Sequence, residues 1–450
     1  MTAAAPFSRA GSSEAETAGI YSLAAVGAVL TLLVIVTPFA FSIGGDNFYM
    51  ALMIPAGLLT LFATRLAERV SVTRALWLIL GLGIVLRGFV LLYDPILSND
   101  IYRYIWDGRV QAAGINPYRY YPAHEALASL RDPAIYANIN RPDYAVTIYP
   151  PVAQFFFLIV TRVSESVTMM RLALLGCEAG IVAVILLLLR RIGRPATRIV
   201  AYVWHPLPIW EIANSGHIDA LMVALMMLGI WLAVTRWHLR GAVAVALATL
   251  AKPFAALALP ALWRRWDWRA PCLVLAIWAL CYTPYLLVGA GVFGFLTTGY
   301  LVEEQFVSGE SVWPLAAWRK VFGIYNGDVI AYFAVAALII CGMALGAAFR
   351  RQRTIESSLA DIAGLLLAFL FLLSPNYPWY FLVITPFVAL CGGAPVWTAS
   401  IAALLLQNEV DWDFFVPLLV RKSALYGAFL IACAHSFWLM WRRRSVERTP

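Results

Sequence analysis

Two ionisable side chains in apolar surroundings offer the clearest chemistry in this sequence. Asp100 lies in SNDIYRYIWDGRV, directly after an apolar run, and its carboxylate could accept a proton from a substrate hydroxyl at the mouth of a membrane cavity. Lys252 interrupts the apolar stretch 241–262, where an ammonium group costs about 2.5–3.5 kcal/mol to insert. A phosphate would offset that cost, because lysine binds phosphate as a point charge. The alternatives are snorkelling to an interface and pairing with a carboxylate such as Glu211.

Asp100 also has a structural interpretation, because a carboxylate in the first turn of a helix is favoured by the helix dipole. Asp94 competes for the role of base, although it more simply ends the preceding span. Asp100, Arg103 and Asp107 are spaced to share one face of a helix. This pattern predicts an amphipathic helix at the membrane interface, on which Asp107 and Arg109 pair at the surface.

Other polar groups interrupt the later apolar runs. The segment WEIANSGHIDALM carries Glu211, His217 and Asp219 with few polar neighbours, and ionisable groups at membrane depth indicate function. Alternatively, His217 and Asp219 cap the following helix and satisfy each other. The aromatic candidates for lining a cavity or stacking on a sugar are Tyr149, Trp379 and Tyr380. For the last two, an interfacial aromatic belt is the alternative.

The remaining candidates favour structural roles. The acidic DWD segment at 411–413 is interpreted as a solvated loop rather than a metal site. The 6 cysteines form no CxxC pair or Cys/His cluster, so neither a zinc site nor a disulfide framework is indicated. Arg87 has the same two interpretations as Lys252, and Glu178 lies mid-span without a partner that the sequence identifies.

The elements that must position these groups are membrane helices. Of 450 residues, 62% are hydrophobic and 13% are charged, about half the charged share of a soluble domain, and the mean hydropathy is +0.78. These values exclude a soluble enzyme, a disordered scaffold and a disulfide-stapled secreted domain. The fold class is therefore an all-α polytopic membrane protein of about twelve full spans. The predicted spans are 20–42, 48–64, 75–93, 168–189, 197–211, 218–235, 270–290, 328–349, 359–373, 378–391, 396–407 and 422–441.

The basic residues set the expected orientation, because short loops rich in Lys and Arg stay in the cytoplasm. Both termini are then cytoplasmic, and the net charge of +8 reflects topology rather than nucleic-acid binding. The expected segments are a disordered cytoplasmic tail at 1–19, a membrane domain at 20–441 with large outward loops at 94–147 and 291–327, and a basic cytoplasmic tail at 442–450.

Two apolar stretches do not fit as single crossings under this rule. Lys252-Pro253 breaks the first, which predicts two half-helices at 241–251 and 253–262. Broken helices at membrane depth are tolerated where they line a protein cavity. The second, 150–163, is short, and we expect it to dip into the membrane from the outer face without crossing.

Five motifs in order resemble those of C-type glycosyltransferases (GT-C), and within them the bacterial polyprenol-phosphate-mannose-dependent alpha-mannosyltransferases. They are SNDIYRYIWDGRVQAAGINPY, YPPVAQ, GHIDALM, LAKPFAALALP and SPNYPWYF, between about residues 94 and 391. The resemblance implies a GT-C-like fold in the plasma (inner) membrane, with the active site facing the periplasm or outside. It also implies inverting transfer of a hexose, mannose above all, from a polyprenyl-phosphate donor to a lipid-linked or glycan acceptor hydroxyl, without cofactor or required metal.

The resemblance assigns the catalytic carboxylate to Asp100. Lys252, with His217 and Arg103, would stabilise the phosphate leaving group. The expected substrate-binding residues are Arg103, Tyr149, Glu211, His217, Asp219, Lys252, Trp379 and Tyr380. The rival interpretation is a lipid or solute transporter or flippase, which would need mid-membrane coupling carboxylates and repeated halves.

Overall fold

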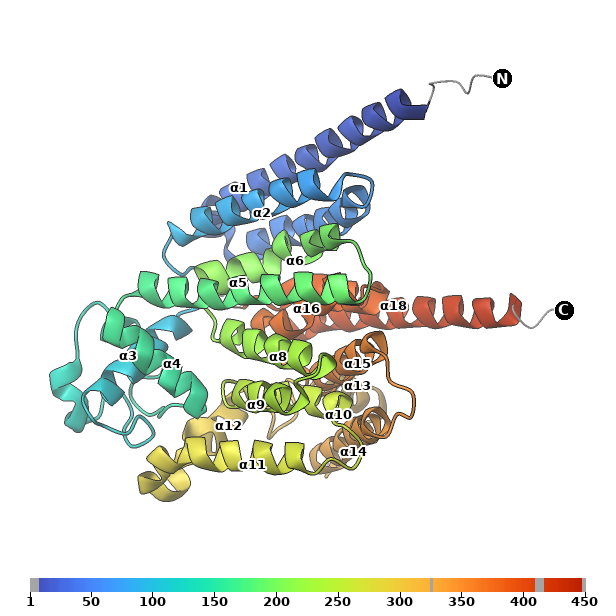
Figure 1. Cartoon of the computed structure of the whole chain (residues 1–450). Coiled ribbons are helices and arrows are strands. Elements are labelled where there is room, and N and C mark those ends of the chain that lie inside the picture. The colour runs from blue at the N-terminus through green and yellow to red at the C-terminus, as the bar shows by residue number, and fades with distance from the viewer. Residues whose placement is uncertain (1–7, 324–326, 409–416, 447–450) are drawn as a thin grey trace, which may run out of the picture.

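The computed structural model describes residues 8–323, 327–408 and 417–446, and all regular structure in these ranges is helical (Figure 1). Seven helices in the described ranges are long and apolar enough to cross a membrane, or eight if one bent pair is counted. They are α1 (Ser8–Ala67), α2 (Val72–Leu91), α5 (Val167–Arg191), α11 (Arg269–Tyr282, continued by η6, Thr283–Phe293), α14 (Asp328–Ala348), α15 (Ile355–Leu373) and α18 (Leu418–Val446). The predicted all-α membrane class is confirmed.

The twelve full spans expected from hydropathy are not confirmed, because several apolar runs form short or broken helices. The shorter ones are α4 (Pro151–Val163), α9 (His238–Thr249), η5 with α10 (Pro253–Leu262), η8 with α16 (Pro378–Leu390) and α17 with η9 (Ala394–Leu406). Proline begins or interrupts most of them, and it removes an N–H donor and disfavours a helical residue before it. Hydropathy therefore identified apolar segments that the structure forms as helices too short or too broken to count as full spans.

The first two predicted spans lie in α1, which contains a break between them. Gly44 and Gly45 have non-helical backbone angles, and Gly45 has φ 54° and ψ −140°, a region open essentially to glycine alone. Figure 1 shows the chain turning back at the end of the first half of α1. The break falls between the predicted spans 20–42 and 48–64.

Both ends of the described chain extend further as helix than the sequence predicted. Residues 8–19 belong to α1, whereas a disordered tail was expected over 1–19. Residues 8–19 contain no proline that would stop a helix, and Glu16 lies 3.6 Å from the guanidinium of Arg74 at the start of α2. At the other end α18 continues to Val446, into the expected basic tail. The N- and C-terminal ends lie on the same side of the molecule, opposite α3 (Asp100–Ala112) and α4 (Figure 1).

The predicted half-helices around Lys252 are confirmed. α9 ends at Thr249, Lys252 is extended (φ −147°, ψ 133°), and η5 begins at Pro253. The break leaves the carbonyl of Leu250 free to accept hydrogen bonds from the N–H groups of Val152 and Ala153 at the start of α4, at 2.9 and 3.3 Å. The helix break is thereby joined to the segment that leaves the first large loop.

A second break separates the predicted spans 197–211 and 218–235. A short π-helix, η4 (Ile209–Asn214), follows α7 (Pro206–Pro208), and the combined segment meets α8 (Asp219–Val234) at 119°. The residues of this bend, including His217, are fully buried. The bend places the start of α8 in the interior beside the Lys252 break.

Helix α3 differs from the interfacial helix that the sequence predicted. Ile101, Tyr104, Ile105 and Trp106 are all buried, because α4 and the segment after η1 (Glu125–Leu130) cover the helix. The Trp106 ring, for example, packs against Tyr136, with 5.5 Å between centroids. Asp100 consequently lies at the start of a helix that the rest of the protein encloses.

Candidate active site

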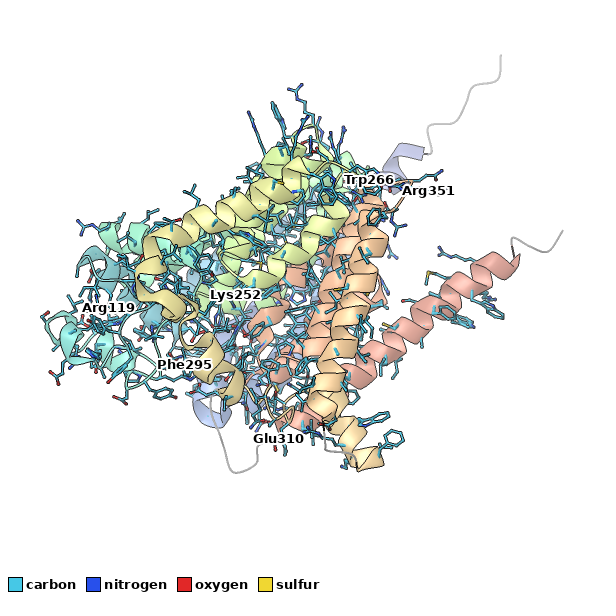
Figure 2. All side chains as sticks on the ribbon, turned by 90° about the horizontal axis from the view of Figure 1, so that it is seen from below. Arg119, Lys252, Trp266, Phe295, Glu310 and Arg351 are labelled. Carbon is cyan, nitrogen blue, oxygen red and sulfur yellow. The ribbon has the colours of Figure 1, made fainter. Side chains whose placement is uncertain are left out.

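A cavity of about 270 Å³ lies between the start of α3 and the break at Lys252. Figure 2 shows Lys252 in the middle of the molecule. Phe295 lies on one side of it, and Trp266 and Arg351 lie on the opposite side. The predicted site residues that line this cavity are Asp100, Arg103, Tyr149, Lys252, Trp379 and Tyr380. Residues from four of the five motifs therefore converge on one space.

Asp100 occupies the first position of α3 and also faces the cavity. Its backbone N–H donates to the Ser98 hydroxyl at 3.3 Å, and its Oδ1 accepts from Asn140 Nδ2 at 2.9 Å. The side chain is 22% exposed. The helix-start interpretation and the cavity interpretation of Asp100 are thus both satisfied geometrically, whereas Asp94 is exposed and absent from the cavity wall.

Lys252 pairs with a carboxylate, but the partner is Asp219 and not Glu211. Its Nζ lies 2.6 Å from Asp219 Oδ2 and 5.0 Å from the centroid of the Tyr380 ring. An ammonium group has three donors, and one of them is engaged by Asp219. The pair offsets the cost of holding Lys252 at the break while leaving the ammonium on the cavity wall.

Three predicted substrate-binding residues, Glu211, His217 and Asp219, are fully buried behind the wall rather than on it. His217 Nε2 lies 3.2 Å from Glu211 Oε2, and His217 Nδ1 lies 4.0 Å from Asp100 Oδ2. The His217 ring stacks on Trp379, with centroids 4.3 Å apart. The bend before α8 thus carries all three groups inward, and of the three His217 packs against Trp379 and lies close to Asp100.

Arg103 lines the cavity, but its guanidinium already has protein partners. Its Nε donates to Asp107 Oδ1 at 2.9 Å, and its Nη1 donates to the Ala145 carbonyl at 2.9 Å. Asp107 Oδ2 also accepts from Gln154 Nε2 of α4 at 2.9 Å. This buried network fixes α3 to α4 and to the end of the first large loop.

The expected surface pair of Asp107 and Arg109 is wrong, because Asp107 is buried and faces Arg103. Arg109 binds two other carboxylates, Asp132 at 3.0 Å and Glu165 at 2.7 Å. The hydrogen bond from Arg109 lowers the pKa of Asp132 to about 2. Arg109 thereby anchors the loop after η1 against α3.

The aromatic candidates form part of the cavity wall. The backbone carbonyl of Tyr149 accepts a hydrogen bond from the Tyr118 hydroxyl at 2.5 Å. The Tyr149 ring packs edge-on against the ring of Tyr104. Tyr377 stacks on Trp379 at 4.3 Å, and the Tyr380 hydroxyl bonds to that of Tyr300. The aromatic residues at 377–380 therefore lie inside the protein rather than in an interfacial belt.

Sequence reasoning missed several polar residues of the wall, among them Arg141 and Glu304. Arg141 pairs with Glu303, and buried Glu304 accepts from Asn376 Nδ2 at 2.7 Å. Burial raises the pKa of Glu304. The one signal that could have found these residues is their position in the two long outward loops, since no spacing pattern marks them.

A polar cavity of about 260 Å³ adjoins the first and shares Arg141, Glu304 and Tyr377 with it. Buried Lys422 lies on its wall and donates to Asn376 Oδ1 and to the carbonyls of Ser311 and Ser374, at 2.6–2.8 Å. The two cavities together give the site two polar compartments with a common wall.

No group of three or more His, Cys, Asp or Glu side chains that could hold a metal ion occurs within the ranges that the structure describes. The predicted solvated DWD loop at 411–413 lies outside those ranges.

Comparison with known proteins gives two matches. Residues 89–267 match the family described as alpha-(1->6)-mannopyranosyltransferase, N-terminal domain. A segment of 181 residues is 30% identical to the protein named alpha-(1->6)-mannopyranosyltransferase A of Mycobacterium tuberculosis, covering 40% of this chain and 34% of that relative. The similarity thus spans about a third of the relative's length, and no solved structure matches the chain. The resemblance inferred from the motifs is confirmed: over residues 89–267 this chain is similar to the alpha-(1->6)-mannopyranosyltransferases.

Proposed function

We propose that this protein is a GT-C-like membrane glycosyltransferase that transfers a hexose, mannose above all, from a polyprenyl phosphate to an acceptor hydroxyl on the outer face of the membrane. The observation that carries the proposal is that Asp100 and Lys252 line one cavity. A base and a cation in the same space are what removal of a hydroxyl proton and departure of a phosphate require. The similarity to mannosyltransferases over 89–267 supports mannose as the sugar.

The reaction is a single in-line displacement. The acceptor oxygen attacks the anomeric carbon while Asp100 takes the hydroxyl proton, and the bond from that carbon to the phosphate oxygen breaks with its electron pair leaving on the phosphate. Inversion at the anomeric carbon follows from attack opposite the leaving group. A positioned base contributes typically about 10²–10⁴-fold to such a step.

Lys252 acts on the leaving group in this scheme. Two of its three N–H donors remain after the contact with Asp219, and negative charge collects on the departing phosphate oxygen near them. Preorganised donors stabilise such charge strongly because they need no reorganisation during the reaction. Arg103, held by Asp107 and Ala145, is a positioning residue for α3 rather than a phosphate ligand.

The adjoining polar cavity supplies the approach for the acceptor. Its carboxylates and amides, including Glu303, Glu304 and Asn376, suit the hydroxyl groups of a glycan, and its shared wall leads to the Asp100 cavity. The ring of Tyr377, which lines both cavities, offers an aromatic surface on which a sugar ring can pack.

The transporter alternative receives no specific support from the described structure. The mid-span charges Arg87 and Glu178, which a coupling mechanism could have used, pair with each other at 2.6 Å.

The experiment is to incubate the purified full-length protein with polyprenyl-phosphate mannose, labelled in the sugar, and a membrane glycolipid acceptor. Parallel reactions use polyprenyl-phosphate glucose, and Asp100→Asn serves as the inactive variant. We expect labelled mannosyl product whose anomeric configuration is opposite to that of the donor. Absence of transfer from either donor, or product formed equally by Asp100→Asn, would overturn the proposal.

A further inference from the structure

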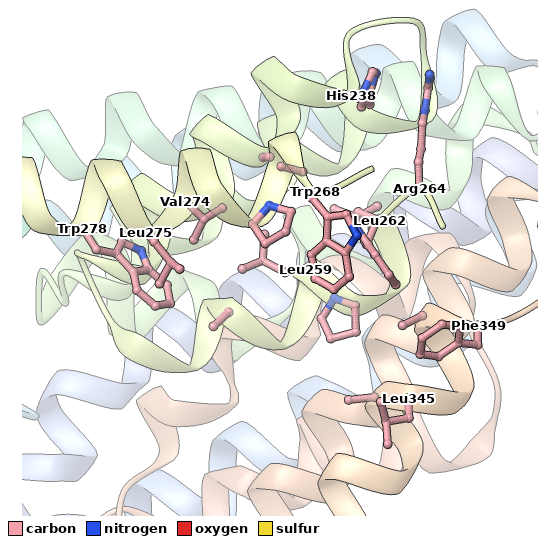
Figure 3. A pocket seen from close by; sticks show the side chains of 18 residues that line it. His238, Leu259, Leu262, Arg264, Trp268, Val274, Leu275, Trp278, Leu345 and Phe349 are labelled. Carbon is pink, nitrogen blue, oxygen red and sulfur yellow. The ribbon is translucent and has the colours of Figure 1, made fainter. Parts of the chain in front are cut away.

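A third cavity, of about 560 Å³, lies between α9, α10, α11 and α14 and shares no lining residue with the two compartments of the candidate active site (Figure 3). Its walls are almost entirely aliphatic and aromatic. Among them are Leu259, Leu262, Val274, Leu275, Trp278 and Leu345. Walls of this character offer a sugar few hydrogen-bond partners and suit a hydrocarbon chain.

Charged and titratable side chains occur at one end of this cavity only. Figure 3 shows His238 and Arg264 together at that end. His238 Nε2 lies 2.9 Å from Asp267 Oδ2, which fixes the loop between α10 and α11. Exposed Arg264 extends from that loop, so its guanidinium is accessible beside the opening of an apolar space.

More arginines surround the same end. Arg265 lies in the same loop, with its guanidinium 5.9 Å from the ring of Phe349 on the cavity wall. Arg353 donates to the carbonyls of Trp263 and Ala347 and so joins the loop after α14 to the rim. Within the described residues, Arg264 and Arg265 make no ion pair with a carboxylate. The rim therefore carries positive charge that the protein itself does not neutralise.

The position of the rim matches that of a lipid headgroup. Arg269 begins one candidate span and Ala348 ends another, and both segments meet the cavity at its basic end. An acyl chain can enter between spans only from the bilayer, with its headgroup left at the span ends. Basic residues at this level attract anionic headgroups.

We infer that this cavity binds one acyl chain of an anionic phospholipid, with the headgroup phosphate at Arg264 and Arg265. Charge complementarity at the rim selects the anionic lipid, and the apolar walls hold the chain. The inference is independent of the proposed transferase activity, because the cavity lies apart from Asp100 and Lys252.

The test uses the full-length protein in phosphatidylcholine nanodiscs to which a photoactivatable lipid probe is added. The probe is either phosphatidylglycerol or phosphatidylcholine, and both carry a diazirine in the acyl chain. After irradiation, labelled peptides are mapped by mass spectrometry. The peptides of interest are those that carry residues 259–268 and Leu345. We expect their labelling by phosphatidylglycerol to exceed that by phosphatidylcholine by about five-fold for each arginine that contacts the headgroup. Equal labelling by the two lipids would overturn the inference.

Two variants separate the headgroup contact from the chain contact. Arg264→Gln should lower labelling by phosphatidylglycerol about five-fold, whereas Arg443→Gln, an exposed arginine on α18, should not. Ala344→Phe narrows the cavity and should lower labelling by both lipids, while Ala337→Phe on the exposed face of α14 should not. Wild-type labelling of Arg264→Gln or of Ala344→Phe would contradict the inference.

Discussion

The ammonium nitrogen of Lys252 lies 2.6 Å from a carboxylate oxygen of Asp219, where α9 breaks and α8 begins. Asp219 is fully buried, whereas Lys252 lies on the cavity wall. Removing either partner would leave the other charge uncompensated inside the protein, which is far more costly than removing both. The pair therefore couples the stability of the fold to the presence of a cation in the site.

Lys252→Ala should weaken both the protein and its use of the donor. The free energy of unfolding should fall by about 3–5 kcal/mol, because Asp219 is left buried without its partner. The kcat/KM for the polyprenyl-phosphate donor should fall more than that for the acceptor, because the lost ammonium faces the leaving group. Thermal unfolding and initial rates with each substrate varied measure the two effects.

The double variant Lys252→Gln with Asp219→Asn separates stability from chemistry. It removes both charges and keeps a hydrogen-bonding pair, so most of the stability should return while donor use stays low. Recovery of donor use in this variant, or equal losses for donor and acceptor in Lys252→Ala, would count against the phosphate role.

Asp100→Asn should lower the transfer rate by about 10²–10⁴-fold without changing the fold. The amide oxygen can still accept the hydrogen bond from Asn140, so the start of α3 should stay in place. The matched control is Asp94→Asn, an exposed carboxylate just before α3, which should retain the wild-type rate. The measurement is the transfer of radiolabelled sugar by the purified variants. Wild-type activity of Asp100→Asn would show that Asp100 is not the general base.

The features that could be predicted from the sequence follow from local rules. Lys252 precedes a proline, which forces an extended residue and removes a donor, so the two half-helices could be placed within a few residues. Asp100 follows Ser98 and Asn99 at the end of an apolar run, which is typical of a helix start. Both statements depend only on neighbouring residues.

The pairings could not be predicted, because they depend on how distant segments pack. Lys252 pairs with Asp219 rather than with Glu211, because the 119° bend turns the start of α8 inward and so brings Asp219 to the ammonium group. Arg87 and Glu178 are 91 positions apart. Glu304 reaches the cavity from a long loop without any periodic pattern. Hydropathy likewise does not distinguish a full span from a short helix such as α4, because it depends on composition alone and carries no information on where the backbone bends.

The ion pair between Arg87 on α2 and Glu178 on α5 predicts a stability effect away from the site. Two parallel hydrogen bonds of 2.7 and 2.6 Å join the guanidinium to the carboxylate, and neither residue lines the candidate cavity. Glu178→Leu should lower the unfolding free energy by about 3–5 kcal/mol, with an unchanged rate per folded molecule. Glu178→Leu with Arg87→Leu should recover most of that loss. An unaltered Tm for the single variant would show that the pair contributes nothing.

Gly108 tests whether the contact between α3 and α4 sets the position of Asp100. A Cβ atom at Gly108 would lie 2.6 Å from the Phe157 carbonyl oxygen and 2.5 Å from Thr161 Oγ1 of α4, closer than packed atoms allow. Gly108→Ala should therefore push α3 away from α4, at a cost of about 1–3 kcal/mol, and should lower kcat because Asp100 begins the displaced helix. Gly176→Ala on α5, where nothing lies within 4 Å of the added atom, is the matched control; it should leave kcat unchanged and should not lower the stability, because alanine favours helix over glycine. Rates and unfolding curves of Gly108→Ala that match those of the control would mean that α3 can move without disturbing the base.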